Sequence, residues 1–247
     1  MSDPSADPKA FDNAAEAAHD HDGDHDDNAG NANNNSNAAA AAAGGPLAGA
    51  PNLAQLTKKK VAVKVGMVGD SQIGKTSLMV KYVEGSFNED YVQTLGVNFM
   101  QKTIQLTSTD ITFTIWDLGG QKEYLHMLPL VCNDAVALLF MFDLSRKSTL
   151  TSIKNWYKQA RMLNKTAPPF LIGTKFDQFS QMKPEEQEEI TTQARRFAKA
   201  MKAPLIFCSA SHSINVHKIF KIVLAKAFDL KCNVDKIERV GEPIIEY

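Results

Sequence analysis

From Val61 onward, short runs of apolar residues alternate with longer segments in which apolar residues recur at helical spacing. The short runs are rich in β-branched and aromatic residues and predict strands, whereas the recurrence predicts amphipathic helices. The strands are expected at 61–69, 97–106, 111–119, 135–145, 169–177 and 204–211, and the helices near 75–85, 148–163, 184–201 and 214–229. Pro184 suits the first turn of its helix, because that position needs no N–H donor.

The last three strands are apolar on both faces, which is typical of strands inside a mainly parallel sheet covered by helices. The strands at 97–106 and 111–119 are separated by a short turn at Ser108 to Asp110, which predicts an antiparallel pair. We therefore predict a doubly wound α/β domain with a six-stranded, mostly parallel sheet and about five helices. The ligand of such a domain is expected at the carboxyl ends of the strands.

The composition divides the chain near residue 57. Residues 1–57 hold nine of the 28 acidic residues and one of the 27 basic residues, and they are rich in Asn and Ala. No apolar periodicity is present, so this segment is predicted to be a disordered acidic tail. The run "HDHDGDHDD" can bind a divalent metal loosely, but it is interpreted as a solvated segment and assigned no site. The folded domain is expected at 58–230, followed by a C-terminal extension at 231–247.

Several classes of function are disfavoured by composition. The Lys and Arg residues are scattered and lack interleaved aromatic residues, so no nucleic-acid partner is expected. The three cysteines show no Cys-x-x-Cys spacing, which favours a reducing compartment without a metal site. No apolar stretch approaches about 18 residues, so no transmembrane segment is expected. Met1 is followed by Ser2, and the chain ends "IIEY", so no lipid anchor is expected.

The stretch "GDSQIGKT", from Gly69 to Thr76, lies between a predicted strand and a predicted helix. This context predicts a phosphate-binding loop, in which backbone N–H groups and the helix N-terminus hold the β-phosphate. Lys75 is expected to reach the β- and γ-phosphates, and Thr76 Oγ1 to bind Mg²⁺. The predicted nucleotide-binding residues of this loop are Gly69, Asp70, Ser71, Gln72, Ile73, Gly74, Lys75, Thr76 and Ser77.

A phosphate-binding loop alone leaves a nucleotide kinase, an ATPase and a GTPase open. The stretch "WDLGGQ" places Asp117 where it can hold Mg²⁺ through water, and Gly120 where its N–H can meet the γ-phosphate. Gln121 can orient the attacking water, so Gln121 and Lys75 are the candidate catalytic residues. Thr94 can close over Mg²⁺ and the γ-phosphate. The metal ligands are therefore expected to be Thr76, Thr94 and, through water, Asp117.

The stretch "GTKFD" at 173–177 indicates which base is bound. Asp177 can accept hydrogen bonds from the N1–H and N2–H₂ groups of guanine, which adenine lacks, while the stem of Lys175 lies over the ring. Ala210 can offer its N–H to O6, and Phe87 can meet the other side of the base. The predicted base-binding residues are Phe87, Thr174, Lys175, Asp177, Ser209 and Ala210, and the predicted ligands are GTP and GDP with Mg²⁺.

These stretches, in this order, resemble the Ras superfamily of small GTPases over residues 61 to about 230. Within it, "GDSQIGKTSLMVKYVEGSFNEDYVQTLGVNF", "DLGGQKEYLHMLPLV" and the closing "GEPIIEY" resemble the septum-promoting GTPases of fungi. That resemblance implies a monomeric G-domain and a cell-cycle switch for septation and mitotic exit, placed in the cytoplasm and at the spindle pole body. It also implies a protein kinase as effector and a two-component GTPase-activating complex.

Two other functions stay open at this point: a Rab-like trafficking GTPase, and a pseudo-GTPase that binds nucleotide only as a scaffold. The sequence also departs from the superfamily pattern. Thr174 replaces Asn, Ser211 replaces Lys, and Gln72 replaces a common Gly, while Leu118 and Gly119 replace Thr and Ala. The changes at 174 and 211 each remove a polar or packing contact to the base, so they predict faster GDP release by about 5- to 150-fold.

Overall fold

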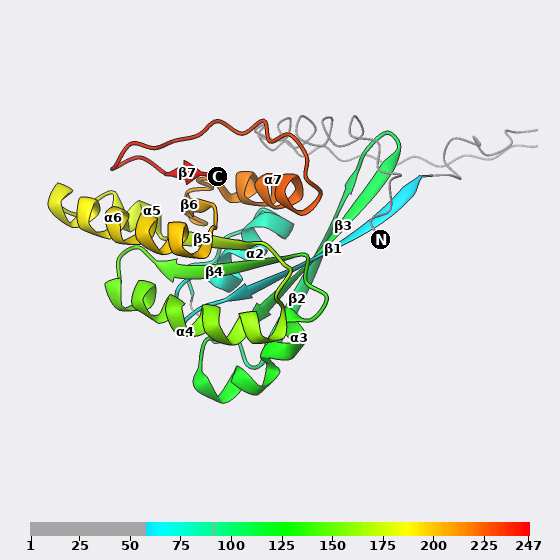
Figure 1. The fold of residues 1–247 in the computed structure, drawn as a ribbon, viewed down its shortest axis with the longest axis horizontal. Helices are drawn as coiled ribbons and strands as arrows, with labels where there is room; N and C mark the ends of the chain where they lie inside the picture. Colours follow the sequence, from blue (N-terminus) through cyan, green and yellow to red (C-terminus); the bar gives the residue numbers. More distant parts are fainter. Residues whose placement is uncertain (1–57, 91) are drawn as a thin grey trace, which may run out of the picture.

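The computed structural model describes residues 58–90 and 92–247, and it places helices on both faces of a central sheet (Figure 1). The predicted acidic tail, residues 1–57, lies outside the described residues. The sheet has seven strands. They are β1 (Lys59–Val68), β2 (Val97–Gln105), β3 (Thr109–Leu118), β4 (Ala137–Asp143), β5 (Pro169–Thr174), β6 (Leu205–Phe207) and β7 (Ile245–Glu246).

The strand order is β2-β3-β1-β4-β5-β6-β7. β2 and β3 are antiparallel and joined by a short turn, as predicted, while β1, β3, β4, β5 and β6 run parallel to one another. The mostly parallel α/β sheet is therefore confirmed. The predicted count of six strands is one too low, because β7 pairs antiparallel with β6 through only two residues. So short a strand leaves no alternating pattern in the sequence.

The helices cover the two faces of the sheet unequally. α2 and α7 pack on one face, and α3, α4 and α6 pack on the other. The helical segments of the described residues are α2 (Lys75–Glu84), η2 (Lys122–Met127), α3 (Leu128–Cys132), α4 (Lys147–Leu163), α5 (Phe176–Phe179), α6 (Pro184–Met201) and α7 (Val216–Ala227). The four helices predicted with residue ranges correspond to α2, α4, α6 and α7, and Pro184 occupies the start of α6 as expected. The described residues form six α-helices, against about five predicted. The shorter helices are missed because one turn carries no periodicity.

The central strands fix the position of the site. Every residue of β4 and β5 is buried. Alternate side chains of β4 point to opposite faces, so Leu139 packs in the cluster beneath α2 and α7, whereas Phe140 packs in the cluster beneath α4 and α6. Burial on both faces fixes the register of these strands. Their carboxyl ends consequently form one rigid edge from which the functional loops emerge.

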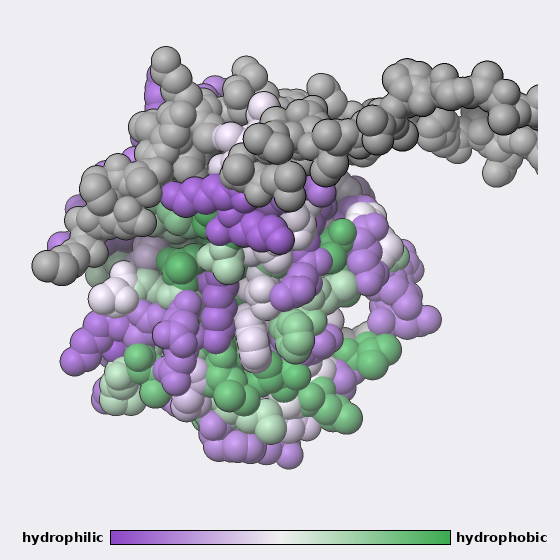
Figure 2. Space-filling view, turned by 90° about the vertical axis from the view of Figure 1, so that its right-hand side faces the viewer, coloured by the Kyte–Doolittle hydropathy of each residue, from purple (hydrophilic) through white to green (hydrophobic). Residues whose placement is uncertain are grey.

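Some large hydrophobic side chains remain at the surface. In the segment that leads into β2, Val92 is 78% exposed and Leu95 is 73% exposed. Figure 2 turns the right-hand side of Figure 1 toward the viewer and shows hydrophobic residues gathered on the lower part of that face among hydrophilic ones. No helix in the described ranges is long and apolar enough to cross a membrane.

Candidate functional site

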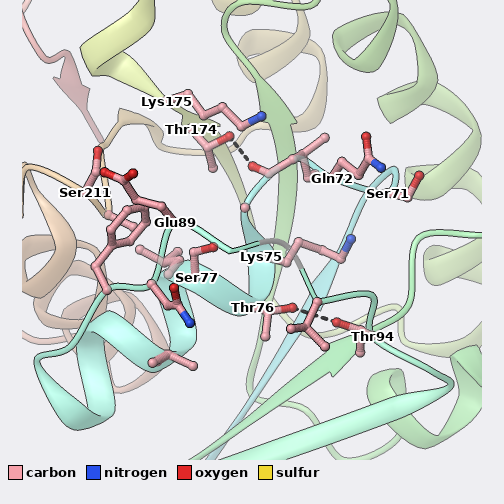
Figure 3. Close-up of a pocket in the computed structure, with 18 of the residues that line it drawn as sticks. Ser71, Gln72, Lys75, Thr76, Ser77, Glu89, Thr94, Thr174, Lys175 and Ser211 are labelled. Atoms are coloured by element: carbon pink, nitrogen blue, oxygen red, sulfur yellow. Dashed lines mark hydrogen bonds between the residues drawn. The ribbon is translucent and has the colours of Figure 1, made fainter.

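A cavity of about 590 Å³ opens at the carboxyl ends of β1, β3, β5 and β6, where the topology predicts the ligand (Figure 3). This volume lies within the range of small-molecule binding pockets. The predicted residues that line it are Ser71, Gln72, Ile73, Gly74, Lys75, Thr76, Ser77, Phe87, Thr94, Gly120, Gln121, Thr174, Lys175, Asp177 and Ala210. Segments far apart in the sequence therefore meet around one space.

Four predicted residues do not line the cavity but contact residues that do. Gly69 and Asp70 accept hydrogen bonds from Lys75, Asp117 accepts one from Thr76, and Ser209 donates one to Asp177. The sequence prediction missed other lining residues. These include Ser86, Asn88, Glu89, Asp90 and Gln178. Gln178 lies in the short helix α5 and the others lie in the loop after α2, so only their proximity in the chain to Phe87 or Asp177 could have indicated them.

The loop between β1 and α2 is shaped by its backbone. Gly69 has φ 150°, and a Cβ there would collide with the carbonyl oxygen of Met141. Gly74 has φ 88°, in the left-handed region that favours Gly, and a Cβ there would meet no atom within 4 Å. Gln72, which replaces a common Gly, also has a positive φ of 62°, a conformation that is strained for most residues other than Gly. The resulting turn leads directly into the N-terminus of α2, which favours an anion.

Lys75 crosses the inside of this loop. Its ammonium group donates to the carbonyl oxygens of Gly69 at 3.0 Å and Asp70 at 2.7 Å, and the residue is 6% exposed. Burial lowers the pKa of Lys75, whereas the charges of Asp117 and Asp70 oppose this shift. A buried cation held by carbonyl groups at a helix N-terminus is well suited to bind the phosphate groups of a nucleotide.

Three oxygen atoms converge beside Lys75. Thr76 Oγ1 lies 2.7 Å from Thr94 Oγ1 and donates to Asp117 Oδ2 at 2.5 Å, while Thr94 Oγ1 lies 3.4 Å from the same Oδ2 atom. Asp117 is fully buried and its Oδ1 has no hydrogen-bond partner. Burial raises the pKa of Asp117, although Lys75 opposes the shift. Hydroxyl and carboxylate oxygens are the ligands Mg²⁺ prefers, so these residues fit that ion.

Among the described residues, no group of three or more His, Cys, Asp or Glu could hold a metal ion. A cation at Thr76, Thr94 and Asp117 would therefore take its other ligands from phosphate and water, as Mg²⁺ commonly does. When bound, such an ion neutralises negative charge that develops on the β- and γ-phosphates.

Gly120 and Gln121 follow β3, and both line the cavity. A Cβ on Gly120 would collide with the backbone of Asp70 and Ser71. The Gly120 backbone thus lies directly against the phosphate-binding loop. Gln121 immediately precedes η2, has an extended backbone and lines the cavity. This placement suits a residue that positions a water molecule near the terminal phosphate.

The loop after β6, residues 209–214, orients Asp177 through hydrogen bonds within the protein. Ser209 Oγ donates to Asp177 Oδ1 at 2.5 Å, and Ser209 Oγ also accepts the N–H of His212 at 3.2 Å. Ser211 Oγ lies 3.0 Å from Ser209 Oγ. Behind this loop, burial raises the pKa of the Cys208 thiol to about 12, which keeps the thiol neutral. The carboxylate of Asp177 is therefore held in one orientation at the edge of the cavity.

Thr174 joins the base-binding segment at 173–177 to the phosphate-binding loop (Figure 3). Its Oγ1 lies 2.5 Å from the carbonyl oxygen of Ile73 and 2.9 Å from that of Phe142. A hydroxyl group has one hydrogen to share between these acceptors, whereas the amide of an Asn would supply two. The link between the loops is thus retained but weakened, so the change at 174 costs less than a complete hydrogen bond.

Thr174→Asn combined with Ser211→Lys is expected to slow GDP release by about 2- to 30-fold, because one hydrogen bond is worth roughly 0.5–1.5 kcal/mol and the Lys stem adds packing. The rate is measured in stopped flow with a fluorescent GDP analogue. The two single variants separate the contributions of the positions. Release at the wild-type rate in the double variant would contradict the prediction.

Sequence reasoning missed a second connection between the loops. The fully buried carboxylate of Asp143 accepts hydrogen bonds from Lys175 Nζ and Arg146 Nε, both at 2.9 Å. Arg146 also donates to the carbonyl oxygen of Ser71 at 3.0 Å. Burial alone would raise the pKa of Asp143, but the bonds from Lys175 and Ser145 lower it below its usual value. The only sequence signal was an acidic residue at the end of a buried strand.

Comparison with known proteins identifies relatives of most of the chain. Residues 64–229 match the Ras family. The chain is 70% identical over 195 residues to Septum-promoting GTP-binding protein 1 of Schizosaccharomyces pombe, covering 79% of this chain and 98% of that protein. It is also 30% identical over 180 residues to Ras-related protein SEC4 of Saccharomyces cerevisiae, covering 72% and 80% of the two chains. Identity to human Ras-related protein Rab-22A is 29% over 162 residues, which cover 64% of this chain and 79% of Rab-22A.

Proposed function

This chain belongs to the Ras family of small GTPases, and we propose that it is a GTP-hydrolysing switch that triggers septation and mitotic exit by recruiting a protein kinase in its GTP-bound form. The 70% identity to a septum-promoting GTP-binding protein carries this proposal. The convergence of the phosphate loop, the oxygen cluster and Asp177 on one cavity supports the hydrolytic part.

The residues divide the work of hydrolysis as follows. Lys75 and the backbone of the phosphate-binding loop hold the phosphates, and Asp177 and Lys175 hold guanine. Gln121 orients the attacking water, and the Gly120 N–H faces the γ-phosphate. Because the reaction needs little covalent chemistry from the protein, these positioning and electrostatic contacts supply the catalysis.

An arginine beside the terminal phosphate speeds GTP hydrolysis. None of the described residues that line the cavity is an arginine, and Arg146 is already engaged by Asp143 and by the Ser71 carbonyl. We therefore expect slow intrinsic hydrolysis. A two-component GTPase-activating complex would supply an Arg or a Gln in trans, with a rate gain of about 10³ to 10⁵.

The effector surface is expected beside Thr94. Thr94 belongs to the cation cluster, and the neighbouring Val92 and Leu95 are largely exposed. Contact of Thr94 with the cation and the γ-phosphate would order this segment, and loss of the phosphate would release it. An effector kinase would thereby distinguish GTP from GDP. The spindle pole body and cytoplasm are the proposed locations, and the G-domain is proposed to act as a monomer.

Gln121→Leu is expected to reduce single-turnover GTP hydrolysis by roughly tenfold to a hundredfold while GTP affinity is preserved, because only the positioning of water is lost. Gln178→Leu is the matched control, since Gln178 lines the same cavity next to Asp177. Equal hydrolysis rates in the Gln121 variant and the wild type would contradict the role of Gln121. Only the intrinsic rate tests it, because an activating protein can supply its own Gln.

The switch is tested in cells that lack the activating complex, where the chain should stay bound to GTP. A form that keeps GTP should retain the kinase and promote septation, and a GDP-bound form should not. A chain that never hydrolyses GTP, even with the activating complex, would indicate the scaffold function. Localisation to trafficking membranes without enrichment at spindle poles would instead indicate the Rab-like function.

A further inference from the structure

The C-terminal residues 243–246 lie along the outer edge of β6. The Phe207 N–H donates to the carbonyl oxygen of Ile244 at 2.8 Å, and Ile206 pairs with Ile245. Ile244 and Ile245 are fully buried. Figure 1 shows β7 beside β6 at the edge of the sheet, close to the C-terminus. The last strand is consequently part of the packed domain.

β6 leads directly into the guanine loop at residues 209–214. On its inner side, the Cys208 N–H donates to the carbonyl oxygen of Gly173 at 2.7 Å, which fixes β6 against β5. The loop is closed by two hydrogen bonds between Ser209 and Ile214, at 3.1 and 2.9 Å. The loop that holds Asp177 in place is therefore positioned by β6, and β6 has β5 on one side and residues 243–246 on the other.

Asn215 connects the end of this loop to both structures. Its side-chain Nδ2 donates to the carbonyl oxygens of Phe207 and Pro243, each at 2.9 Å. The residue is 7% exposed and has a φ of 57°. One buried amide thus holds the loop, the strand that carries it and the C-terminal segment together.

Contacts with α6 and with Ile237 also hold the C-terminal segment, residues 243–246. The Arg195 guanidinium, from α6, bonds to the Glu246 carboxylate at 2.7–2.8 Å and to the carbonyl oxygen of Glu238. Ile237 and Ile245 exchange two backbone hydrogen bonds, at 3.0 and 2.9 Å. These contacts involve no residue that lines the cavity, so they can be weakened without touching the ligand site.

We propose that residues 243–246 are a positioning element for guanine binding, which acts through Asn215 on the loop at 209–214 and slows GDP release. The inference rests on the proposed function, since it requires that the cavity bind guanine nucleotide. Loosening the segment removes the outer support of β6, and Ser209 then holds Asp177 less firmly. GDP leaves faster although no residue in contact with it has changed.

Asn215→Gly tests this role, because Gly keeps the positive φ and removes only the side-chain amide. GDP release is expected to be about 3- to 10-fold faster than in the wild type. Asp229→Gly is the matched control, since exposed Asp229 near the other end of α7 also has a positive φ, of 51°. The control should release GDP at the wild-type rate.

A second variant acts on residues 243–246 without changing the loop at 209–214, and it tests the proposal if Asn215→Gly does not fold. Arg195→Gln weakens the grip on Glu246 and should speed release by about 2- to 5-fold, whereas Arg196→Gln, on the exposed neighbour, should not. Because both test variants act through one segment, their combined effect should be smaller than the product of the separate effects.

The outcomes separate the two proposals. A wild-type protein that fails to bind the fluorescent GDP analogue would overturn the proposed function, and this inference with it. A wild-type protein that binds GDP, together with folded variants whose release rates are unchanged and whose unfolding temperatures are lowered, would overturn this inference alone. The contacts of residues 243–246 would then serve folding only.

Discussion

Thr76→Asn is expected to weaken GTP binding by about 100-fold or more. Thr76 Oγ1 lies within hydrogen-bonding distance of both Thr94 Oγ1 and Asp117 Oδ2, so it belongs to the cluster of oxygens that fits Mg²⁺. Loss of groups that merely support a metal ligand already costs about 10- to 100-fold in affinity, and this change removes a ligand itself. The longer amide also has to be accommodated against the buried Asp117.

The measurement is a titration with a fluorescent GTP analogue, in Mg²⁺ and in excess chelator. The wild type should bind far more tightly in Mg²⁺, whereas the variant should lose most of this difference. GDP binding should suffer less, because it lacks the γ-phosphate that shares the cation. Thr151→Asn provides the same substitution on an exposed face of α4 and should change nothing. Wild-type affinity and Mg²⁺ dependence in the Thr76 variant would remove the oxygen cluster from the proposed mechanism.

The parts of the site that sequence could locate are those encoded within a few residues. "GDSQIGKT" places its loop between a strand and a helix, so Lys75 and Thr76 come to the cavity together. The same reasoning places Asp177 at the cavity, since it follows a buried strand. In each case the local backbone and the strand ends fix the position, and parallel pairing then brings the loops to one edge.

The contacts that sequence could not locate join distant segments through side chains of ordinary type. Arg146 reaches Ser71 across 75 positions, and Asn215 reaches Pro243 across 28. No spacing rule connects these residues, and two-residue β7 shows no periodicity. Each contact became visible only when the strand order was known, because that order decides which loops are neighbours.

These long-range contacts also change what the departures from the family pattern mean. The sequence predicts weaker nucleotide binding because of Thr174, but Thr174 Oγ1 still donates to the Ile73 carbonyl oxygen. In addition, Asp143 links Lys175 to Arg146, which donates to the Ser71 carbonyl oxygen. Two connections therefore join the base-binding segment at 173–177 to the phosphate-binding loop. GDP residence time should depend on several modest contacts, whereas the choice of base should depend on Asp177.

Asp177→Asn is expected to weaken guanine nucleotide binding by about 10² to 10⁴, because two hydrogen bonds to a charged acceptor are worth roughly 1.5–3 kcal/mol each. The amide keeps one acceptor oxygen, which can still accept from Ser209 Oγ. Its NH₂ group, however, would face the N2–H₂ group of guanine, so two donors would oppose each other. Xanthine carries a carbonyl oxygen at that position and can accept from the amide, so the preference should shift toward xanthine nucleotides.

Competition of GDP, XDP and ADP against a fluorescent GDP analogue measures this preference in the wild type, and a fluorescent XDP analogue serves for the variant. Asp143→Asn is the informative control, because it replaces a buried carboxylate that contacts Lys175 but not the base edge. That control should alter affinity without changing the order of preference. An Asp177→Asn variant that still prefers GDP over XDP would show that the carboxylate does not contact the guanine edge. The base would then have to be selected elsewhere in the loop, with the Ala210 N–H as the next group to test.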